Sequence, residues 1–378
     1  MMKMTRYILL ACLLLWSACS RQENIKGVHV VLQKPEIRQR YGGEMGALAD
    51  ELKEAGVNLV ISPVMENGTA YYPSDVLPQR WEYGTQLLAF RHELRRRHIR
   101  FAAYIPVFRD AYTYRSQPNL RAVSEYGNPA GSEPLAAICP RDPEYRRYKL
   151  AAVREVMLIL QPDAVYFSDL AFPLESPDPC DEHAVNNALS YCFCTNCQQT
   201  FSDYAGISLP RNSSTVAETA AWILENHPGK WVQWKSEVIT SFMEQAHHAI
   251  REINPDCRIM LSVLPWTEEQ FDHGRRRLSG QDIQTLSPFL DHFVLHPAGR
   301  IPKETLDSIR IELDRELEIS GGWTVPSLDP GLLPASEGSE REFQRNLQYF
   351  RNHIIVSDWG YLLKNRRYLN IFKSEPIL

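Results

Sequence analysis

Residues 143–172 read PEYRRYKLAAVREVMLILQPDAVYFSDLAF, which is one complete step from a helix to a strand. In residues 143–160 the apolar side chains recur every three or four positions, and this spacing predicts an amphipathic helix. Residues 164–172 form a run rich in apolar and aromatic side chains. Such continuous runs are typical of strands that a parallel sheet buries on both faces. The stretch therefore predicts one unit of an α/β fold.

The same alternation recurs along the chain. Strands are predicted at 28–33, 58–64, 101–108, 164–172, 258–266, 292–297, 317–327 and 354–362. Helices are predicted at 44–56, 85–98, 143–160, 234–253, 303–314 and 340–353. Eight strands that alternate with helices predict a (β/α)8 TIM barrel. An open doubly wound sheet is the alternative, and its nucleotide-binding form is disfavoured because no GxGxxG follows the first strand.

Two long segments between the predicted elements locate the functional end of such a barrel. One runs from 109 to 141 after the third strand, and the other runs from 173 to about 230 after the fourth. Active sites of TIM barrels lie at the carboxyl ends of the strands, in the loops that follow them. We therefore expect both segments to cover one side of the barrel mouth.

The first residues indicate export. Lys3 and Arg6 precede an apolar run at 7–16, which is too short to span a bilayer and fits a secretory signal. The following sequence, LWSAC, resembles a bacterial lipobox that ends at Cys19, where acylation would anchor the chain to a membrane surface. An ordinary cleaved signal and an uncleaved anchor are the alternatives. The expected location is the cell envelope.

These assignments divide the chain into a signal peptide at 1–18, a short linker at 19–26 and a single domain at 27–378. The net charge of −5 becomes about −7 when Lys3 and Arg6 are removed. This mild acidity argues against nucleic acid as a partner, because a nucleic-acid-binding protein needs a basic face.

Three cysteines lie close together in the predicted loop after the fourth strand. Cys192, Cys194 and Cys197 have the spacing CxCxxC, which can wrap thiolates around one metal ion. A fourth ligand must come from elsewhere, and Cys139 is the first choice, with Cys180 as the other candidate. Structural zinc is the first interpretation. Disulfides, such as Cys180–Cys192 or Cys139–Cys180, are the alternative in an oxidising compartment, and a redox centre is the least favoured.

Several motifs resemble those of known protein families. DAVYFSDLAFP (163–173) followed by CFCTNCQQTF (192–201) looks like the zinc-bearing loop of family-42 β-galactosidases. Together with ICPRDPEYR (138–146) and VSDWGY (356–361), these stretches resemble the glycoside-hydrolase-like TIM-barrel lipoproteins of bacteria. Those lipoproteins are distantly related to the hydrolase domain of poly-N-acetylglucosamine-processing enzymes. The resemblance implies a carbohydrate-active barrel.

The resemblance also implies a role for one residue. FSDLA (167–171) is similar to the FHDDA of the poly-N-acetylglucosamine hydrolases, whose first aspartate is catalytic, and this implies a catalytic role for Asp169. Leu170 replaces the second aspartate of that pattern. Trp323 and Thr324 stand where family-42 enzymes keep their nucleophilic glutamate, so the activity of that family is not expected.

Glycoside hydrolysis uses two carboxylates that flank the scissile bond, about 5 Å apart in retaining enzymes and about 6.5–9.5 Å apart in inverting enzymes. Asp169 is the first candidate, because it leaves the fourth predicted strand pointing at the mouth. Asp358, placed at the end of the eighth strand, and Glu66, which follows the second, are the candidates for its partner. Each of the three could instead be a structural, capping or salt-bridged residue. A carbohydrate-binding lipoprotein without catalysis is therefore the alternative function.

Aromatic and polar side chains near the predicted strand ends could bind a sugar, because pyranose faces pack on flat rings. These candidates are Tyr71, Tyr72, Tyr104, Arg109, Trp266, His296, Trp323 and Trp359.

Overall fold

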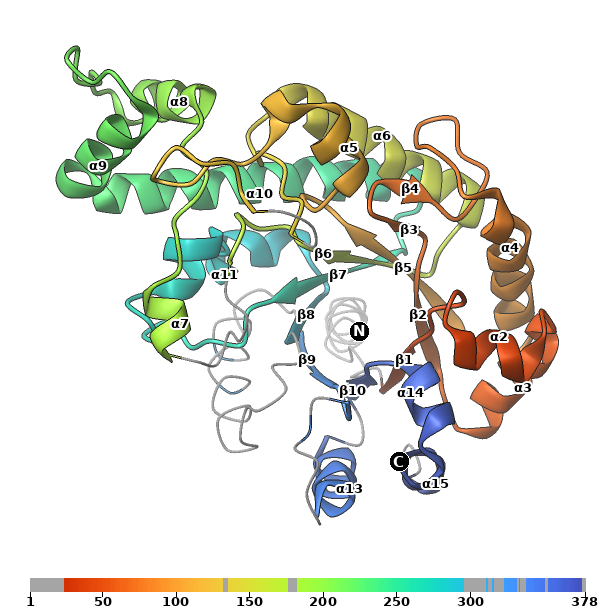
Figure 1. The fold of residues 1–378 in the computed structure, drawn as a ribbon. Helices are drawn as coiled ribbons and strands as arrows, with labels where there is room; N and C mark the ends of the chain where they lie inside the picture. Colours follow the sequence, from red (N-terminus) through yellow and green to blue (C-terminus); the bar gives the residue numbers. More distant parts are fainter. Residues whose placement is uncertain are drawn as a thin grey trace, which may run out of the picture.

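In the computed structural model the predicted barrel is present. The structure describes residues 24–131, 135–175, 182–295, 311, 315, 323–331, 333, 338–350 and 353–375. Eight parallel strands close into one ring, in which β1 pairs with both β10 and β2 (Figure 1). In ring order the strands are β1 (Ile25–His29), β10 (His353–Val356), β9 (Trp323–Leu328), β8 (His292–Leu295), β7 (Arg258–Val263), β6 (Ala164–Ser168), β5 (Arg100–Pro106) and β2 (Leu59–Pro63). The prediction of a TIM barrel is confirmed, and the open sheet is excluded.

Helices surround the ring on its outer face (Figure 1). They are α2 (Pro35–Tyr41), α3 (Met45–Glu54), α4 (Trp81–Arg96), α6 (Pro143–Leu160), α10 (Pro228–Ile253), α11 (Ile283–Leu286), α13 (Ser339–Tyr349), α14 (Trp359–Lys364) and α15 (Arg366–Ser374). The predicted helix at 303–314 falls almost entirely outside the described residues, as do the signal peptide and Cys19. Among the residues that are described, no helix combines the length and the apolarity needed to cross a membrane.

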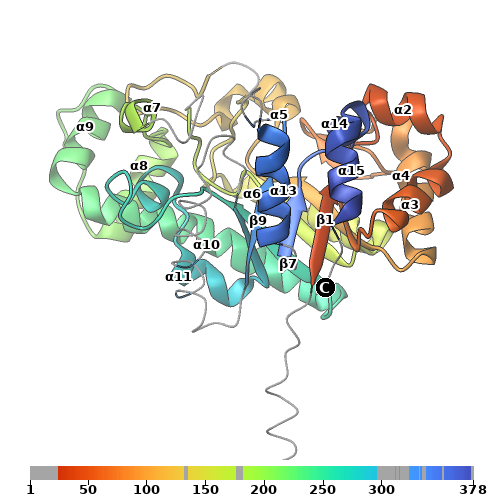
Figure 2. The same ribbon diagram turned by 90° about the horizontal axis from the view of Figure 1, so that it is seen from below.

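The two long segments carry short elements of their own. The first holds α5 (Ala111–Ser116), and the second holds α7 (Glu182–Asn186), α8 (Thr195–Ala205) and α9 (Val216–Asn226). A hairpin of β3 (Met65–Glu66) and β4 (Thr69–Ala70) follows β2. Figure 2 shows α5, α7 and α14 at the same end of the barrel, as expected for elements that follow the carboxyl ends of the strands.

A buried carboxylate ties the start of the barrel to its end. Glu51 of α3 accepts hydrogen bonds from Arg40 Nε at 2.8 Å, from the Tyr41 hydroxyl at 2.7 Å and from Lys373 Nζ at 2.9 Å. Tyr41 in turn accepts a hydrogen bond of 3.2 Å from Trp359 Nε1. This network joins α2 and α3 to α14 and α15, which are more than 300 residues away in the sequence.

The network gives stability that depends on pH. Burial raises the pKa of Glu51, but the hydrogen bonds from Arg40, Tyr41 and Lys373 outweigh burial and lower the pKa to about 2. Because the unfolded value is about 4.3, this stabilisation is complete above about pH 5 and is lost as the pH falls toward 2.

We expect Glu51→Gln to lower the free energy of unfolding by about 2 kcal/mol at pH 7 and by less than half as much at pH 3. Urea unfolding at the two pH values measures the difference. The control is Glu54→Gln, at an exposed position on the same helix. An equal deficit at both pH values would contradict the assignment.

Candidate active site at the barrel mouth

The carboxylate of Asp169 lies directly after β6, at the functional end of the barrel. Its Oδ2 accepts a hydrogen bond of 2.9 Å from the Ser168 hydroxyl, and its Oδ1 is 4.0 Å from Nη1 of Arg109. The side chains of Asp169 and Arg109 are 33 % and 45 % exposed, so both remain accessible to a ligand. Asp169 has a φ of 52°, a backbone conformation that is uncommon for residues other than glycine and that clusters at functional sites.

Asp169 and Arg109 open into a cavity of about 310 Å³ between β5, β6 and β7. Other side chains in its wall are polar groups of Ser262, Ser279 and Gln281 and apolar groups of Phe172 and Leu264. Asp169 is the only carboxylate among the described residues that line this cavity. The cavity therefore offers hydroxyl, amide and guanidinium groups around a single acid.

Three rings lie together at the end of the barrel interior. His29 at the end of β1 is 5.9 Å from Tyr104 and 5.7 Å from Tyr166, and the two tyrosine rings are 5.5 Å apart. Burial raises the pKa of both tyrosines well above its usual value, and the nearby charge of Asp169 adds to the shift. Both hydroxyls therefore stay protonated beside that carboxylate. Tyr104 is among the predicted sugar-binding residues, whereas His29 and Tyr166 are not. Both lie within the predicted strands 28–33 and 164–172, where the sequence pattern does not distinguish them from core residues.

A buried ion pair lies behind the site. Lys149 Nζ of α6 is 3.6 Å from Oδ2 of Asp110, and the two side chains are 1 % and 0 % exposed. The same carboxylate accepts hydrogen bonds from the Tyr145 hydroxyl at 3.2 Å and from the backbone N–H of Thr113 at 2.8 Å. Burial lowers the pKa of Lys149, and the charges of Asp110 and Asp169 oppose that shift. The pair fixes the start of α5, next to Arg109.

Glu66 projects from the hairpin after β2 and is exposed. Its carboxylate accepts a hydrogen bond from the Tyr71 hydroxyl. The hairpin packs on the start of α5, since a Cβ added to Gly68 would lie 2.0 Å from Oδ1 of Asp110. Glu66 is therefore held beside the loop that carries Arg109.

Asp358 follows β10, which lies directly across the ring from β6. Its Oδ1 accepts a hydrogen bond of 3.0 Å from the backbone N–H of Gly360 at the start of α14, and its Oδ2 forms an ion pair with Lys34. Like Asp169 it has a positive φ, of 87°. The structure thus gives Asp358 a capping and ion-pairing role.

Four of the predicted sugar-binding aromatics are buried instead. Tyr71, Tyr72, Trp266 and Trp359 are at most 2 % exposed. Tyr72 donates a hydrogen bond of 2.9 Å to Glu155, and Trp266 packs edge-on against Phe271. The expectation that these four rings line an open site is wrong for this structure, because neighbouring helices and loops cover them. His296 and the side chain of Trp323 lie outside the described residues.

The four predicted cysteines do converge. The sulfurs of Cys139, Cys192, Cys194 and Cys197 lie within 4.8 Å of one another. Sγ of Cys139 is 3.3 Å from that of Cys197 and 3.8 Å from that of Cys194. A disulfide bond has a sulfur–sulfur distance of about 2.05 Å. Four zinc–sulfur bonds of about 2.3 Å in a tetrahedron place the sulfurs about 3.8 Å apart. The four sulfurs therefore fit a metal ion, whereas the alternative disulfides, Cys180–Cys192 and Cys139–Cys180, involve a cysteine outside the described residues.

The cysteine cluster joins the two long segments to each other. Cys139 lies near the end of the first segment, and the other three lie in the second segment, just before or in the first turn of α8. Contacts with Cys139 and the other thiols lower the pKa of Cys194, which favours a thiolate there. Cys180 lies outside the described residues, and Cys257 is a separate buried thiol beside Met157. A metal at this place would be structural, because none of the four cysteines lines the cavity at Asp169.

No protein-family model matches the chain, and no curated protein matches its sequence. Solved structures do resemble it in fold. The glycoside hydrolase domain of PgaB (BpsB) from Bordetella bronchiseptica matches with a TM-score of 0.65 at 14% identity, over 94% of this chain and 99% of that one. Gan42B, a GH42 β-galactosidase from G. stearothermophilus, matches with a TM-score of 0.60 at 12% identity. The solved structures thus include both kinds of hydrolase that the sequence motifs resemble.

Gan42B is covered over 56% of its length and this chain over 94%. An α-L-fucosidase from Paenibacillus thiaminolyticus matches with a TM-score of 0.61 at 14% identity, over 93% of this chain and 49% of that one. The chain thus spans about half the length of these two enzymes. At such low identities the likeness shows a fold shared with glycoside hydrolases.

Proposed function

We propose that this protein is a glycoside hydrolase that acts on a poly- or oligosaccharide. The observation that carries the proposal is the carboxylate of Asp169, which stands at the carboxyl end of β6 and opens into the cavity beside Arg109. This is the place where TIM-barrel enzymes carry their catalytic groups. The fold shared with the PgaB hydrolase domain and with the β-galactosidases supports the same assignment.

In this proposal Asp169 is one of the two carboxylates of the hydrolytic reaction. One carboxyl group of such a pair protonates the leaving oxygen, and the other attacks the sugar or activates water. The Arg109 guanidinium and the Ser168 hydroxyl hold Asp169 in place and can bind sugar hydroxyls. The protonated hydroxyls of Tyr104 and Tyr166 lie below the site.

Glu66 is the proposed partner, because its hairpin packs on the loop of Arg109 and its carboxylate is exposed. We expect Glu66→Gln to lower hydrolysis about a hundredfold, as for the loss of one general acid or base. Asp358→Asn should act mainly on stability, since Asp358 caps α14 and pairs with Lys34. Initial rates and melting temperatures of both variants separate the two roles. Lost hydrolysis in Asp358→Asn with normal activity in Glu66→Gln would reverse the assignment.

A carbohydrate-binding protein without catalysis is the second candidate. The observation in its favour is that Asp169 is the only acid among the described residues of the cavity wall. The discriminating experiment exposes the purified protein to a panel of glycans and measures bound glycan and newly released reducing ends. Release supports the hydrolase, whereas binding without release supports the alternative.

We further propose that the four-cysteine site holds zinc and that the chain is exported and anchored by a lipid on Cys19. Zinc is supported by the four sulfur ligands and their spacing. The anchor is supported by the residue pattern at 1–19 alone. Labelling of cells with a radioactive fatty acid, with and without Cys19→Ser, tests the anchor.

A further inference from the structure

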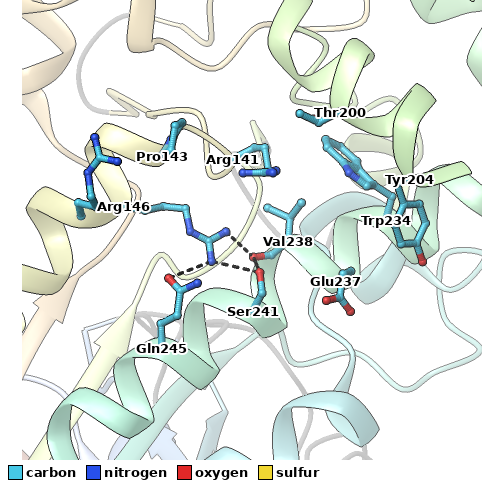
Figure 3. A pocket seen from close by; sticks show the side chains of 11 residues that line it. Arg141, Pro143, Arg146, Thr200, Tyr204, Trp234, Glu237, Val238, Ser241 and Gln245 are labelled. Carbon is cyan, nitrogen blue, oxygen red and sulfur yellow. Dashed lines mark hydrogen bonds between the residues drawn. The ribbon is translucent and has the colours of Figure 1, made fainter.

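A second cleft lies on the outer face of the barrel, between α6, α8 and α10 (Figure 3). Its volume is about 420 Å³, and it shares no lining residue with the cavity at Asp169. Three arginines line it, Arg141, Arg146 and Arg147, against a single carboxylate, that of Glu237. In a chain with a net charge of −5, this is a local excess of positive charge.

Arg146 is a buried charge, and no carboxylate of the described residues contacts it. The residue is 6 % exposed, and its guanidinium donates to the Val238 carbonyl at 3.1 Å, to Ser241 Oγ at 3.1 Å and to Gln245 Oε1 at 3.4 Å. All three acceptors are neutral. Burial, and next the charge of Arg141, lower the pKa of this guanidinium to about 10, and the charge of Glu237 opposes the shift without forming an ion pair with Arg146. A buried charge without a counter-ion is unfavourable, so a bound anion would stabilise this arrangement.

The other two guanidinium groups are available to a ligand. Arg141 has no hydrogen bond or ion pair within the described part of the chain, and in Figure 3 its guanidinium lies between Arg146 and Trp234. The side chain of Arg147 is 73 % exposed, and its nearest carboxylate, that of Glu144, is 4.0 Å away. Planar guanidinium groups match the paired oxygens of phosphate, sulfate and carboxylate.

The wall opposite the arginines carries one exposed ring. Tyr204 is 50 % exposed at the end of α8, whereas Trp234 of α10 lines the cleft but is only 2 % exposed. The Tyr204 ring can pack against the body of a small ligand while the arginines hold its charge. We propose that this cleft binds a sugar-sized ligand that carries a phosphate, sulfate or carboxylate group, held by Arg141, Arg146 and Arg147.

Titration calorimetry on the intact chain tests the proposal with glucose 6-phosphate as the probe and glucose as its uncharged match. We expect saturable binding of glucose 6-phosphate that weakens with added salt, and no binding of glucose at this cleft. Arg141→Gln should weaken the binding about tenfold, and the double variant with Arg147→Gln about a hundredfold, since each removes charge-assisted hydrogen bonds.

The matched control is Arg154→Gln, which changes an arginine on the same helix that pairs with Glu252 at 2.7 Å and does not line the cleft. The Arg154→Gln protein should bind glucose 6-phosphate as tightly as the wild type. The Asp169→Asn protein should do so too, which tests whether this cleft binds independently of the proposed active site. Competition by inorganic phosphate, sulfate or glucuronate identifies the preferred oxyanion. The proposal is overturned if the wild type shows no saturable binding of any of these anions, or if the Arg141→Gln/Arg147→Gln protein binds them as tightly as the control.

Discussion

Replacing Asp169 with asparagine is expected to lower the release of reducing ends from a susceptible glycan by about a thousandfold or more, toward the upper end of what one general acid or base contributes. The amide keeps the size of the side chain and its contact with Ser168, but it can neither donate a proton as an acid nor act as a nucleophile. Binding of the glycan should change far less, because Arg109 and the cavity wall remain.

The measurement is an initial rate of release for both proteins, with glycan binding measured in parallel. Asp256→Asn is the control, because Asp256 is exposed just before β7, at the opposite end of the barrel. Unchanged release in Asp169→Asn would remove Asp169 from the catalytic machinery. Binding without release in the wild type as well would instead favour the binding protein.

The second large effect is expected at the cysteine cluster. Cys197→Ser should abolish stoichiometric zinc binding. It should also lower the free energy of unfolding by about 3–5 kcal/mol, because metal-binding free energy contributes directly to folding. The reason is that Cys139 and the CxCxxC turn come from different segments, which the metal would hold together. Elemental analysis gives the metal content, and thermal or urea unfolding gives the loss of stability.

Cys257→Ala provides the matched control, since Cys257 is a buried thiol outside the cluster. It should keep its zinc and lose about 1 kcal/mol, as for a small buried deletion. A strong chelator should destabilise the wild type and the Cys257→Ala protein but leave Cys197→Ser unchanged. If the wild type contains no metal and resists the chelator, the zinc proposal fails.

The structure confirms the predicted fold but corrects several residues of the predicted site. Tyr71, Tyr72, Trp266 and Trp359 stand near strand ends as expected, yet each is buried, and Tyr72 and Trp359 form hydrogen bonds with residues far away in the chain. The sequence shows that an aromatic residue follows a strand, but it does not show which loop or helix will pack over it. Burial therefore cannot be predicted from spacing.

What the sequence by itself determined is the barrel, the cysteine turn and the position of Asp169 at a strand end. These follow from local patterns: the period of apolar side chains, the spacing CxCxxC and a short motif. Only the tertiary structure decided that Cys139 completes the cluster, that Asp358 pairs with Lys34 and that Lys149 pairs with Asp110 behind the site. These contacts join residues far apart in the chain, and their geometry depends on how whole helices and strands pack around the ring.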